Sequence, residues 1–523
     1  MPSTFHSIET AKRSLFTQTA ALNTTGHNIA NANTEGYTRQ TVKMRASIPM
    51  EAYGINRSNV PGQLGTGVEF DAIERIREKF LDSQYRGENT ELGSWTIRSN
   101  TLDKLQQIMN EPSDTGIRKV LDNFYKSWSD LSKDPESVTA RTIVKENALA
   151  LTDAMNHMSK QLSNLSADLT SNVEAKSSEL QSYVNSIADL NQSITKIEGL
   201  GDNANDLRDQ RDLIVDKISK IVNVTVTDTD QGYNVNMGGQ ALVAGFTPTT
   251  GINGAYLQAA FGSNDLQGGE VHGMIISRDQ FVADYTAQMD NLANTLANGN
   301  VSVTLPKGSV LPEGTVLNGV TYTGTTRTLQ SDLTVTVKGL NGLHQLGYTQ
   351  ESKDVNGNMV AGKPFFVTSG TGGGTITAGN ITLNTVIVDN PNAIAASLRV
   401  TGTAPTEELV KGNNTLASLM ANLKLNNFTS VSTGNTATID SFFSSMVGQL
   451  GIEAQEATRQ TQNATALVSQ VETMRQSVSG VSLDEEMSNM IKFQHAYSAA
   501  ARFMTTFDQL LDKLINSTGV VGR

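Results

Sequence analysis

The chain holds six histidines, the side chains that most often serve acid–base catalysis and metal binding near neutral pH. They are His6, His27, His157, His272, His344 and His495. No two of them stand at the spacing of HExxH or of another metal-ligand motif, and no G-x-S-x-G sequence marks a nucleophilic serine. Cysteine is absent, which excludes a thiolate nucleophile, a cysteine metal site and a disulfide. We therefore expect a protein that is not an enzyme, with no catalytic residue, no metal site and no cofactor; a carboxylate pair within residues 299–405 is the alternative that keeps hydrolysis open.

Two short stretches have the composition of ligand-binding loops but lack a residue that the ligand needs. Residues 62–67 are rich in glycine like a phosphate loop, yet no Lys-Ser or Lys-Thr pair follows them. Asp228, Asp230 and Gly232 are typical of the opening of a calcium loop, but Gly239 occupies the twelfth position, where a bidentate glutamate is required. We interpret both stretches as turns.

Length and charge limit the class of protein. A chain of 523 residues should divide into several domains. A formal net charge of -12 argues against nucleic acid as a partner, because phosphate binding needs a basic surface. Residues 1–32 lack the basic and apolar regions of a cleavable signal peptide, and no run approaches the roughly 20 apolar residues of a membrane span. We expect neither nucleic-acid binding nor membrane insertion.

The strongest pattern lies at the two ends of the chain. In residues 482–516 apolar side chains recur at spacings of three and four, which is typical of a coiled-coil seam, and near the N-terminus four apolar side chains recur at intervals of seven. A seam needs a partner helix, so we expect the two ends to meet. The predicted assembly interface consists of Ile8, Leu15, Leu22, Ile29, Met490, Phe493, Tyr497, Ala500, Met504, Phe507, Leu511 and Leu514. An antiparallel pairing of the two ends within one chain is the alternative to contacts between copies.

The boundaries of these end helices are also marked. Ser482 and Glu485 have the spacing of a capping box, and Asp484, Glu485 and Glu486 suit the positive end of the helix dipole. This interpretation explains the acidic residues without catalysis. Gly36 can adopt the left-handed conformation that ends the first helix. Isolated helices of this length fray, so we expect both ends to be disordered in the free chain and to order on assembly.

Between the ends, helical periodicity alternates with strand-like segments. The pattern predicts a hairpin-like linker at 38–70, helices at 71–109, 206–222, 273–297 and 438–477, a hairpin at 223–237, and one helix of about 60 residues beginning near residue 134. Residues 299–405 are rich in Gly, Thr, Val and Asn, which predicts an all-β insertion, and helix should resume near Thr406. The predicted fold is mainly α, with long coiled-coil-like helices formed by the N- and C-terminal regions together, an inserted all-β domain, and an elongated multi-domain rod.

We expect three domains. A terminal helical coiled-coil assembly domain takes residues 1–36 and 481–523, a helical rod domain with short β-hairpins takes 37–298 and 406–480, and a β-rich outer domain takes 299–405. Glycine-rich and threonine-rich composition marks the last domain off from its helical neighbours.

Two sequence motifs carry a family resemblance. Residues 22–37, LNTTGHNIANANTEGY, resemble the N-terminal signature of bacterial flagellar rod, hook and hook-associated proteins. Residues 493–502, FQHAYSAAAR, are similar to the signature at the other end of that family. Within the family, Arg39-Gln40 after the first motif, the helical middle and the total length look most like a hook-associated member at the junction of hook and filament. The resemblance covers both ends and most of the helical middle and is nearly absent from residues 299–405.

The resemblance implies a function that composition alone does not reach. It implies a structural subunit of the flagellum, secreted through a type III export channel without a cleavable signal peptide, and assembled as a homo-oligomer. It also implies as partners the flagellar hook protein, a second junction protein on the filament side, and an export chaperone that binds the C-terminal region. The alternatives are a hook or distal rod subunit, whose bodies are largely β, and a secreted adhesin whose β insertion binds a partner. His27 and His495 stand inside the signature stretches, where we expect polar interface roles.

Overall fold

The computed structural model describes residues 5–49, 65–109, 116–351, 353–354, 357–370, 373–402 and 406–517. The described residues form two compact units. The first draws on Met1–Thr96, Val173–Gly273 and Gln460–Arg523, and the second on Ile97–Asn172 and Met274–Arg459. Because the chain passes between the units several times, single long helices contribute residues to both.

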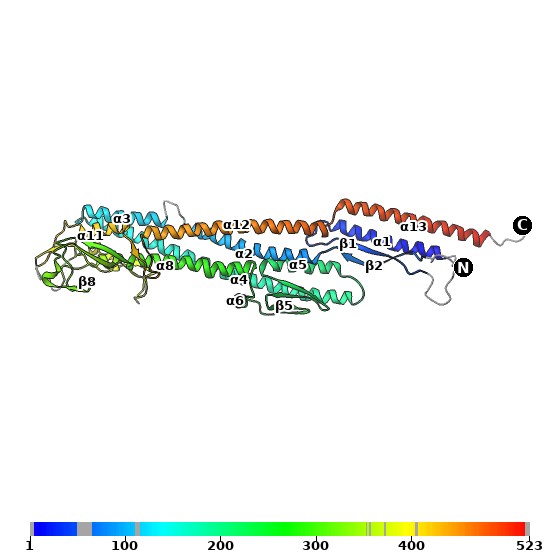
Figure 1. Ribbon diagram of the computed structural model, residues 1–523, viewed down its shortest axis with the longest axis horizontal. Helices are drawn as coiled ribbons and strands as arrows, with labels where there is room; N and C mark the ends of the chain where they lie inside the picture. Colours follow the sequence, from blue (N-terminus) through cyan, green and yellow to red (C-terminus); the bar gives the residue numbers. More distant parts are fainter. Residues whose placement is uncertain are drawn as a thin grey trace. The chain divides into compact units, whose positions relative to one another are not determined.

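The first unit combines the ends of the chain with a helix-covered sheet (Figure 1). Its elements are α1 (His6–Ala30), β1 (Gln40–Ala46), β2 (Val68–Arg75), α5 (Asn205–Ile221), β3 (Thr225–Thr229), β4 (Gly232–Met237), β5 (Gln240–Ala244), β6 (Thr247–Pro248), α6 (Gly254–Gly262) and α13 (Leu483–Ser517). The helices shared with the second unit are α2 (Lys79–Met109), α4 (Val138–Glu198), α7 (Gly269–Ile276) and α12 (Ile439–Ser479).

The second unit contains the β-containing region. Its helices are α3 (Ile117–Lys133), the π-helix η1 (Ser277–Val282), α8 (Ala283–Asn298), η2 (Gly324–Arg327), α9 (Gly339–His344), α10 (Thr385–Asp389), η3 (Pro391–Ala393), α11 (Thr415–Asn422) and η4 (Leu423–Leu425). Its strands are β7 (Asn300–Leu305), β8 (Thr315–Leu317), β9 (Val320–Tyr322), β10 (Leu333–Lys338), β11 (Phe366–Thr368), β12 (Ile381–Leu383), β13 (Val400–Thr401), β14 (Glu408–Leu409), β15 (Phe428–Thr429) and β16 (Thr436–Ala437).

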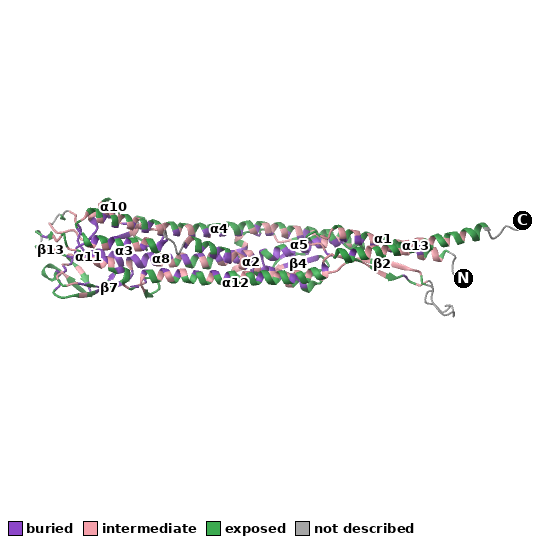
Figure 2. Cartoon of the chain, turned by 90° about the horizontal axis from the view of Figure 1, so that it is seen from above, coloured by how far each residue is buried: buried purple, intermediate pink, exposed green. Residues whose placement is uncertain are grey.

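Helix α4 has 61 residues, close to the length that its apolar spacing predicts. Along it, side chains three or four positions apart are fully buried, among them Leu151, Met155, Leu162, Leu180 and Val184. Figure 2 shows the same helix with buried and exposed residues alternating around its circumference. An amphipathic stripe of this kind forms a stable helix because tertiary packing, rather than local propensity, supplies most of its stability.

In the first unit, α4 is joined to the four-stranded sheet β3-β4-β5-β6 by a buried amide. Asn191 donates from Nδ2 to the carbonyl oxygens of Tyr233 (2.9 Å) and Gly245 (2.7 Å) and accepts from the backbone N–H of Tyr233 (3.0 Å). Arg211 of α5 donates to the same Asn191 Oδ1 at 2.9 Å and lies 3.5 Å over the Tyr233 ring. Buried polar groups need such partners, so Asn191 fixes the sheet on the helix.

Gly93 lies inside α2 at a point where another helix approaches closely. A Cβ atom at Gly93 would lie 2.4 Å from the carbonyl oxygen of Lys220 in α5. Glycine in a helix costs about 1 kcal/mol relative to alanine, and here it permits backbone contact between α2 and α5.

The segment before α2 corrects the predicted secondary structure. Residues 71–75 belong to β2, which pairs antiparallel with β1, and α2 begins at Lys79. The predicted helix over this segment was wrong because its apolar residues, such as Ile73, also fit a strand paired with the preceding hairpin arm. Gly36 has the predicted left-handed backbone (φ 79°), but α1 has already ended at Ala30, so it shapes the following turn.

The core of the second unit is an aromatic cluster. Trp128 of α3 is fully buried and its ring lies 6.4 Å from Phe124, 5.6 Å from Phe365 and 6.5 Å from His344. His344 accepts from the backbone N–H of Ala395 at Nε2 (2.9 Å) and lies 2.5 Å from the carbonyl oxygen of Lys363 at Nδ1. Burial lowers the pKa of His344 to about 4, so the ring is neutral at pH 7.

Strands from within and beyond the predicted insertion complete one sheet, in the order β10-β7-β15-β16. Its inner face buries Val301, Val303, Val335 and Val337, while serine and threonine alternate with them on the outer face. Residues 299–405 also hold the short helices α9 and α10, and helix resumes at Thr415 rather than near Thr406. The predicted mainly helical fold with a β-containing insertion is confirmed, whereas the three-domain division stays a prediction.

Candidate assembly site at the paired termini

The two ends of the chain lie side by side in the first unit. Helices α1 and α13 pack against each other, and the hairpin β1–β2 packs on α1 (Figure 1). Helix α13 carries Asp484, Glu485 and Glu486 in its first turn, as the predicted N-terminus requires. The expected meeting of the ends is therefore present within a single chain.

The predicted seam is only partly covered by this pairing. Ala500 is buried, and Met490, Phe493, Met504, Phe507 and Leu511 are half-buried. Tyr497 and Leu514 remain 41% and 57% exposed. On α1 the four predicted residues Ile8, Leu15, Leu22 and Ile29 are all half-buried. Their role in contacts between copies stays a prediction.

The buried positions of α1 are small or polar. They are Ala11, Thr17, Ala21, Thr24, Thr25 and Asn28. Small side chains let neighbouring backbones approach closely, and Thr17 also donates to the carbonyl oxygen of Val68 in β2. A search for large apolar residues at heptad spacing does not detect such a face.

Large apolar side chains are left exposed on both terminal helices. They are Phe5 and Phe16 on or next to α1, and Leu483, Met487, Ile491, Phe503, Leu510 and Ile515 on α13. Figure 2 shows α13 largely in the colours of exposed and intermediate residues. Exposed apolar surface of this extent marks an interaction site.

Asn28 is the centre of a buried hydrogen-bond network where α1 ends. Its Nδ2 donates to the carbonyl oxygen of Gln40 (2.9 Å) and to Glu486 Oε2 (3.0 Å). Its Oδ1 accepts from the Tyr37 hydroxyl (2.7 Å) and from the Gln40 N–H (3.0 Å). Burial raises the pKa of Tyr37, which keeps its hydroxyl a donor. One side chain thus joins α1, the following turn, β1 and α13.

Glu486 completes the connection from the α13 side. Its side chain is 3% exposed, and it accepts from Arg39 Nε at 2.8 Å as well as from Asn28. Arg39 also donates to Glu485 at 2.7 Å, but the Glu485 side chain is 63% exposed. The helix-dipole interpretation of these acids missed this ion pair. Its sequence signal is the position of Asn28 and Arg39 in and beside the first family motif.

A second network of charges lies between β2, α2, α5 and α12. Four arginines meet four aspartates within it, and none of these side chains is more than 13% exposed. The pairs are Arg75 with Asp209 (2.6 Å) and Asp212 (2.9 Å), Arg77 with Asp82 (2.6 Å), Arg86 with Asp216 (2.7 Å), and Arg475 with Asp216 (2.6 Å). Burial alone would raise the pKa of Asp212, but the guanidinium groups of Arg77, Arg75 and Arg86 lower it to about 2.

The two networks are connected through the backbone. Asp209 of the arginine–aspartate network accepts from the backbone N–H of Thr38 at 2.9 Å, and Thr38 precedes Arg39, which pairs with Glu486. Breaking one member of a buried ion pair is strongly destabilising because it leaves the other charge without compensation. The turn that follows α1 is therefore fixed to α5 on one side and to α13 on the other.

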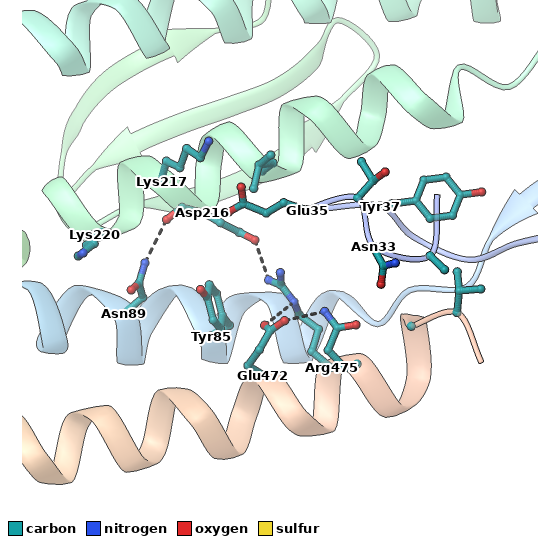
Figure 3. A pocket seen from close by; sticks show the side chains of 17 residues that line it. Asn33, Glu35, Tyr37, Tyr85, Asn89, Asp216, Lys217, Lys220, Glu472 and Arg475 are labelled. Carbon is teal, nitrogen blue, oxygen red and sulfur yellow. Dashed lines mark hydrogen bonds and ion pairs between the residues drawn. The ribbon is translucent and has the colours of Figure 1, made fainter. Parts of the chain in front are cut away.

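A cavity of about 490 Å³ adjoins this region (Figure 3). It is lined by the turn after α1, including Glu35, and by side chains of α2, α5 and α12, including Lys217 and Glu472. Arg475 reaches both Asp216 and Glu472 in Figure 3. Acidic and basic side chains both line its walls, among them Glu35, Lys217 and Glu472.

The histidines have different surroundings. His27 is partly exposed, with Nε2 3.3 Å from Asp206 and its ring 5.5 Å from that of Tyr37. His495 is exposed on α13, and His344 belongs to the core of the second unit. Across the described ranges, no three His, Asp or Glu side chains gather in a way that could hold a metal ion. Among the same residues, no helix is both long and apolar enough to cross a bilayer.

Comparison with protein families places the chain in a class. Residues 8–38 match the family of flagella basal body rod proteins, and residues 475–517 match the C-terminal family of flagellar basal body rod FlgEFG proteins. These two matches cover α1 with its following turn, and α13. The paired termini thus have the sequence of a flagellar axial protein.

The remaining comparisons are more specific. Residues 102–301 match the family described as the flagellar hook-associated protein FlgK helical domain. The chain is 34% identical to flagellar hook-associated protein 1 of Bacillus subtilis over 100% of both chains, and 26% identical to that of Escherichia coli over 97% of this chain and 99% of the relative. The chain belongs to the flagellar hook-associated protein 1 family. A solved structure of the flagellar hook junction protein FlgK from Burkholderia pseudomallei has a TM-score of 0.49 and 16% identity, covering 76% of this chain and 100% of that one.

Proposed function

We propose that this chain is a structural subunit of the bacterial flagellum that joins the hook to the filament, and that its copies assemble through their paired terminal helices. The observation that carries the proposal is the pairing of α1 with α13, which leaves large apolar side chains of both helices exposed. A surface of this kind gains stability only when a partner covers it.

The rest of the site supports a mechanical role. The Asn28–Glu486 network and the arginine–aspartate network fix the paired termini to α5 and α12. A subunit that transmits load needs termini that do not turn freely against the body that carries them. An intact buried ion pair contributes little net stability. The role we propose for these pairs is to fix the orientation of the paired termini.

The relatives from Bacillus subtilis and Escherichia coli are flagellar hook-associated proteins. For this chain we propose the hook protein as partner on one side and a second junction protein on the filament side. The chain would be exported without a cleaved signal and reside outside the cell, with an export chaperone on its C-terminal region. The predicted seam residues of the two terminal helices would form the contacts between copies; they include Ile8 and Leu15 on α1 and Phe493 and Leu514 on α13. We propose no enzymatic activity.

The test is electron microscopy of cells that lack this chain, together with analysis of filament protein in the culture medium. We expect bare hooks and unpolymerised filament subunits in the medium, and complete filaments after the wild-type chain is restored. Cells without hooks would instead indicate a hook or rod subunit. Complete filaments on the deletion strain would exclude a junction role, and the adhesin alternative would then be tested on the second unit.

A further inference from the structure

A second groove lies at the edge of β2. It has a volume of about 510 Å³ and is lined by Phe70 to Ile73 on one side and by the end of α4, the following loop and the start of α5 on the other. All of these residues belong to the first unit.

The walls of this groove are held in place by hydrogen bonds. Asn203 and Asn205 both donate from Nδ2 to the carbonyl oxygen of Ile73, at 3.1 and 2.8 Å. Glu198, the last residue of α4, accepts from Arg208 of α5 through both carboxylate oxygens, at 2.5 and 2.7 Å. The loop between the two helices is therefore closed by an ion pair and attached to β2, so the groove is formed before any partner arrives.

The groove combines exposed apolar side chains with acidic ones. Phe70 is 44% exposed and Ile197 is 37% exposed, and Leu200, the residue before the lining residue Gly201, is 87% exposed. Three aspartates also line it: Asp71, Asp202 and Asp206. Asp71 lies 3.3 Å from Arg45, and Asp206 accepts from Gln40 and faces His27. No lysine or arginine is among the described lining residues. The groove suits an apolar partner with a positive charge.

A second copy of this chain offers such a surface on α1. Phe5 and Phe16 are each 63% exposed. Lys12 stands one turn before Phe16, and its side chain is 54% exposed, with Glu9 of the same helix 3.8 Å away. Residues four apart on a helix are neighbours on its surface, so an ammonium group and an aromatic ring are presented together.

The occupant must come from another copy. In its own chain α1 packs against α13 and the hairpin while Phe5 and Phe16 stay exposed. Helix α13 fits less well, because none of its cations Lys492, Arg502 and Lys513 stands three or four residues from an exposed aromatic side chain. Of the two terminal helices, α1 is the one that places a cation four residues from an exposed aromatic side chain, as Lys12 and Phe16 show.

We infer that the groove between β2 and the α4–α5 loop receives the exposed stripe of α1, Phe5 to Phe16, from a neighbouring copy of this chain. The aromatic rings would cover Phe70, Ile197 and Leu200, and Lys12 would approach Asp202. This inference rests on the proposed assembly of copies at the hook–filament junction and adds the contact surface by which one copy holds the next.

The test uses the absence of cysteine from the chain, because introduced cysteines are then its only thiols. Glu9→Cys lies within the α1 stripe without removing its phenylalanines or Lys12, and Leu200→Cys precedes Gly201, which lines the groove. The double variant is expressed in the deletion strain, flagella are released and oxidised, and the linked species are separated on a non-reducing gel. The matched control combines Glu9→Cys with Leu425→Cys, a leucine of the second unit that is also largely exposed (78%, against 87% for Leu200).

We expect linked dimers and higher oligomers from Glu9→Cys with Leu200→Cys, about tenfold or more above the control, because proximity raises the effective concentration of the two thiols. Equal linkage in the control, or linkage only within one chain, would overturn the inference. So would absence of linkage in cells that carry complete filaments. The presence of filaments on the cells tests the proposed junction function, whereas cross-linking tests the groove contact. Either proposal can therefore fail without the other.

A charge reversal gives a second readout. In the linked double variant, Asp202→Lys should reduce the cross-linked fraction about tenfold, since it places like charges opposite Lys12. Adding Lys12→Glu should restore it. Asp230→Lys, an exposed aspartate of the same unit outside the groove, should leave it unchanged. Failure of Lys12→Glu to restore linkage would contradict the assigned partner.

Discussion

Amphipathic helices form both the α1–α13 pair and the aromatic core around Trp128. The two regions differ in how much of their apolar surface the chain itself buries. Around Trp128, α3 meets Phe365 and Phe366 from the β-containing region, and these side chains are almost completely buried. Along α13, by contrast, Ala500 is the only predicted seam residue among the described ones that the chain itself buries. The first region completes its hydrophobic burial within the chain, and the second keeps apolar surface for a partner.

Different forces therefore fix the two regions. The aromatic core depends on close packing, which penalises any loss of volume. The termini depend on directed polar contacts, such as those of Asn28 and Glu486, which set geometry without covering apolar surface. The difference predicts which substitutions act on the free chain and which act only on the assembly.

The largest change in the free energy of unfolding is expected in the aromatic core around Trp128. Trp128→Ala should destabilise the chain by about 3–5 kcal/mol, because it leaves a cavity between Phe124 and Phe365. Denaturant unfolding of the purified protein measures this loss. Leu425→Ala, at a residue that is 78% exposed, is the control and should change little. A loss under about 1 kcal/mol at Trp128 would mean that this core is not what stabilises the unit.

The next effect is a dependence of the core's stability on pH between 4 and 6.5. The pKa of His344 is about 4 in the folded chain and near 6.5 when unfolded, so the unfolded chain binds a proton first as the pH falls. Stability is therefore full above pH 6.5 and should fall by up to about 3 kcal/mol as the pH drops to 4.

The matching variant is His344→Gln, which removes the titrating ring. It should lower stability at pH 7, because the bonds to Ala395 and Lys363 are disturbed, and should flatten the curve between pH 4 and 6.5. Unfolding free energies measured across this range provide the comparison. An unchanged slope in the variant would assign the pH dependence to other groups.

A smaller effect is expected at the termini. Glu486→Gln removes a buried negative charge that accepts hydrogen bonds from Arg39 and Asn28. It should lower the free energy of local opening of the α1 region by about 2 kcal/mol. Amide hydrogen exchange in α1 measures it. Glu485→Gln, which touches the same arginine from an exposed side chain, should cost less than about 0.5 kcal/mol. Equal effects of the two changes would mean that burial of Glu486 is unimportant.

The smallest effect on the free chain separates the two regions most clearly. Leu514→Ala should change unfolding free energy by less than about 0.5 kcal/mol, because the side chain is 57% exposed. In cells it should still impair filament attachment, scored by swimming and by electron microscopy. A clear loss of stability in the free chain, with filaments intact, would place Leu514 in an internal contact and remove it from the predicted interface.

The elements with a single strong period could be predicted from the sequence. The 61-residue helix α4 and the closeness of the two ends follow from apolar spacing alone. The strand β2 could not, because a short apolar segment fits a strand or a helix equally and only pairing with β1 decides.

The site shows the same limit. Heptad spacing selects one stripe of apolar residues on each terminal helix, and its role between copies stays a prediction. The polar side chains that fix the two helices are far apart in sequence. Asn28 and Glu486 are brought together from opposite ends of the chain, and no local pattern distinguishes a buried carboxylate from an exposed one. The groove beside β2 was likewise out of reach, since it depends on the ion pair between Glu198 and Arg208 closing a loop.

The network around Asn28 also restricts which chemistry position 28 tolerates. Its amide uses two donors and two acceptor positions at once, a combination that aspartate, leucine and serine all lack. Asn28→Asp would place a carboxylate about 3 Å from that of Glu486, and two such groups cannot both ionise there. Spontaneous deamidation of this one side chain would thus convert an attractive contact into a repulsive one, and the firm closure around it keeps water away from the amide. The lifetime of this contact between α1 and α13 then depends on how well a single amide is shielded.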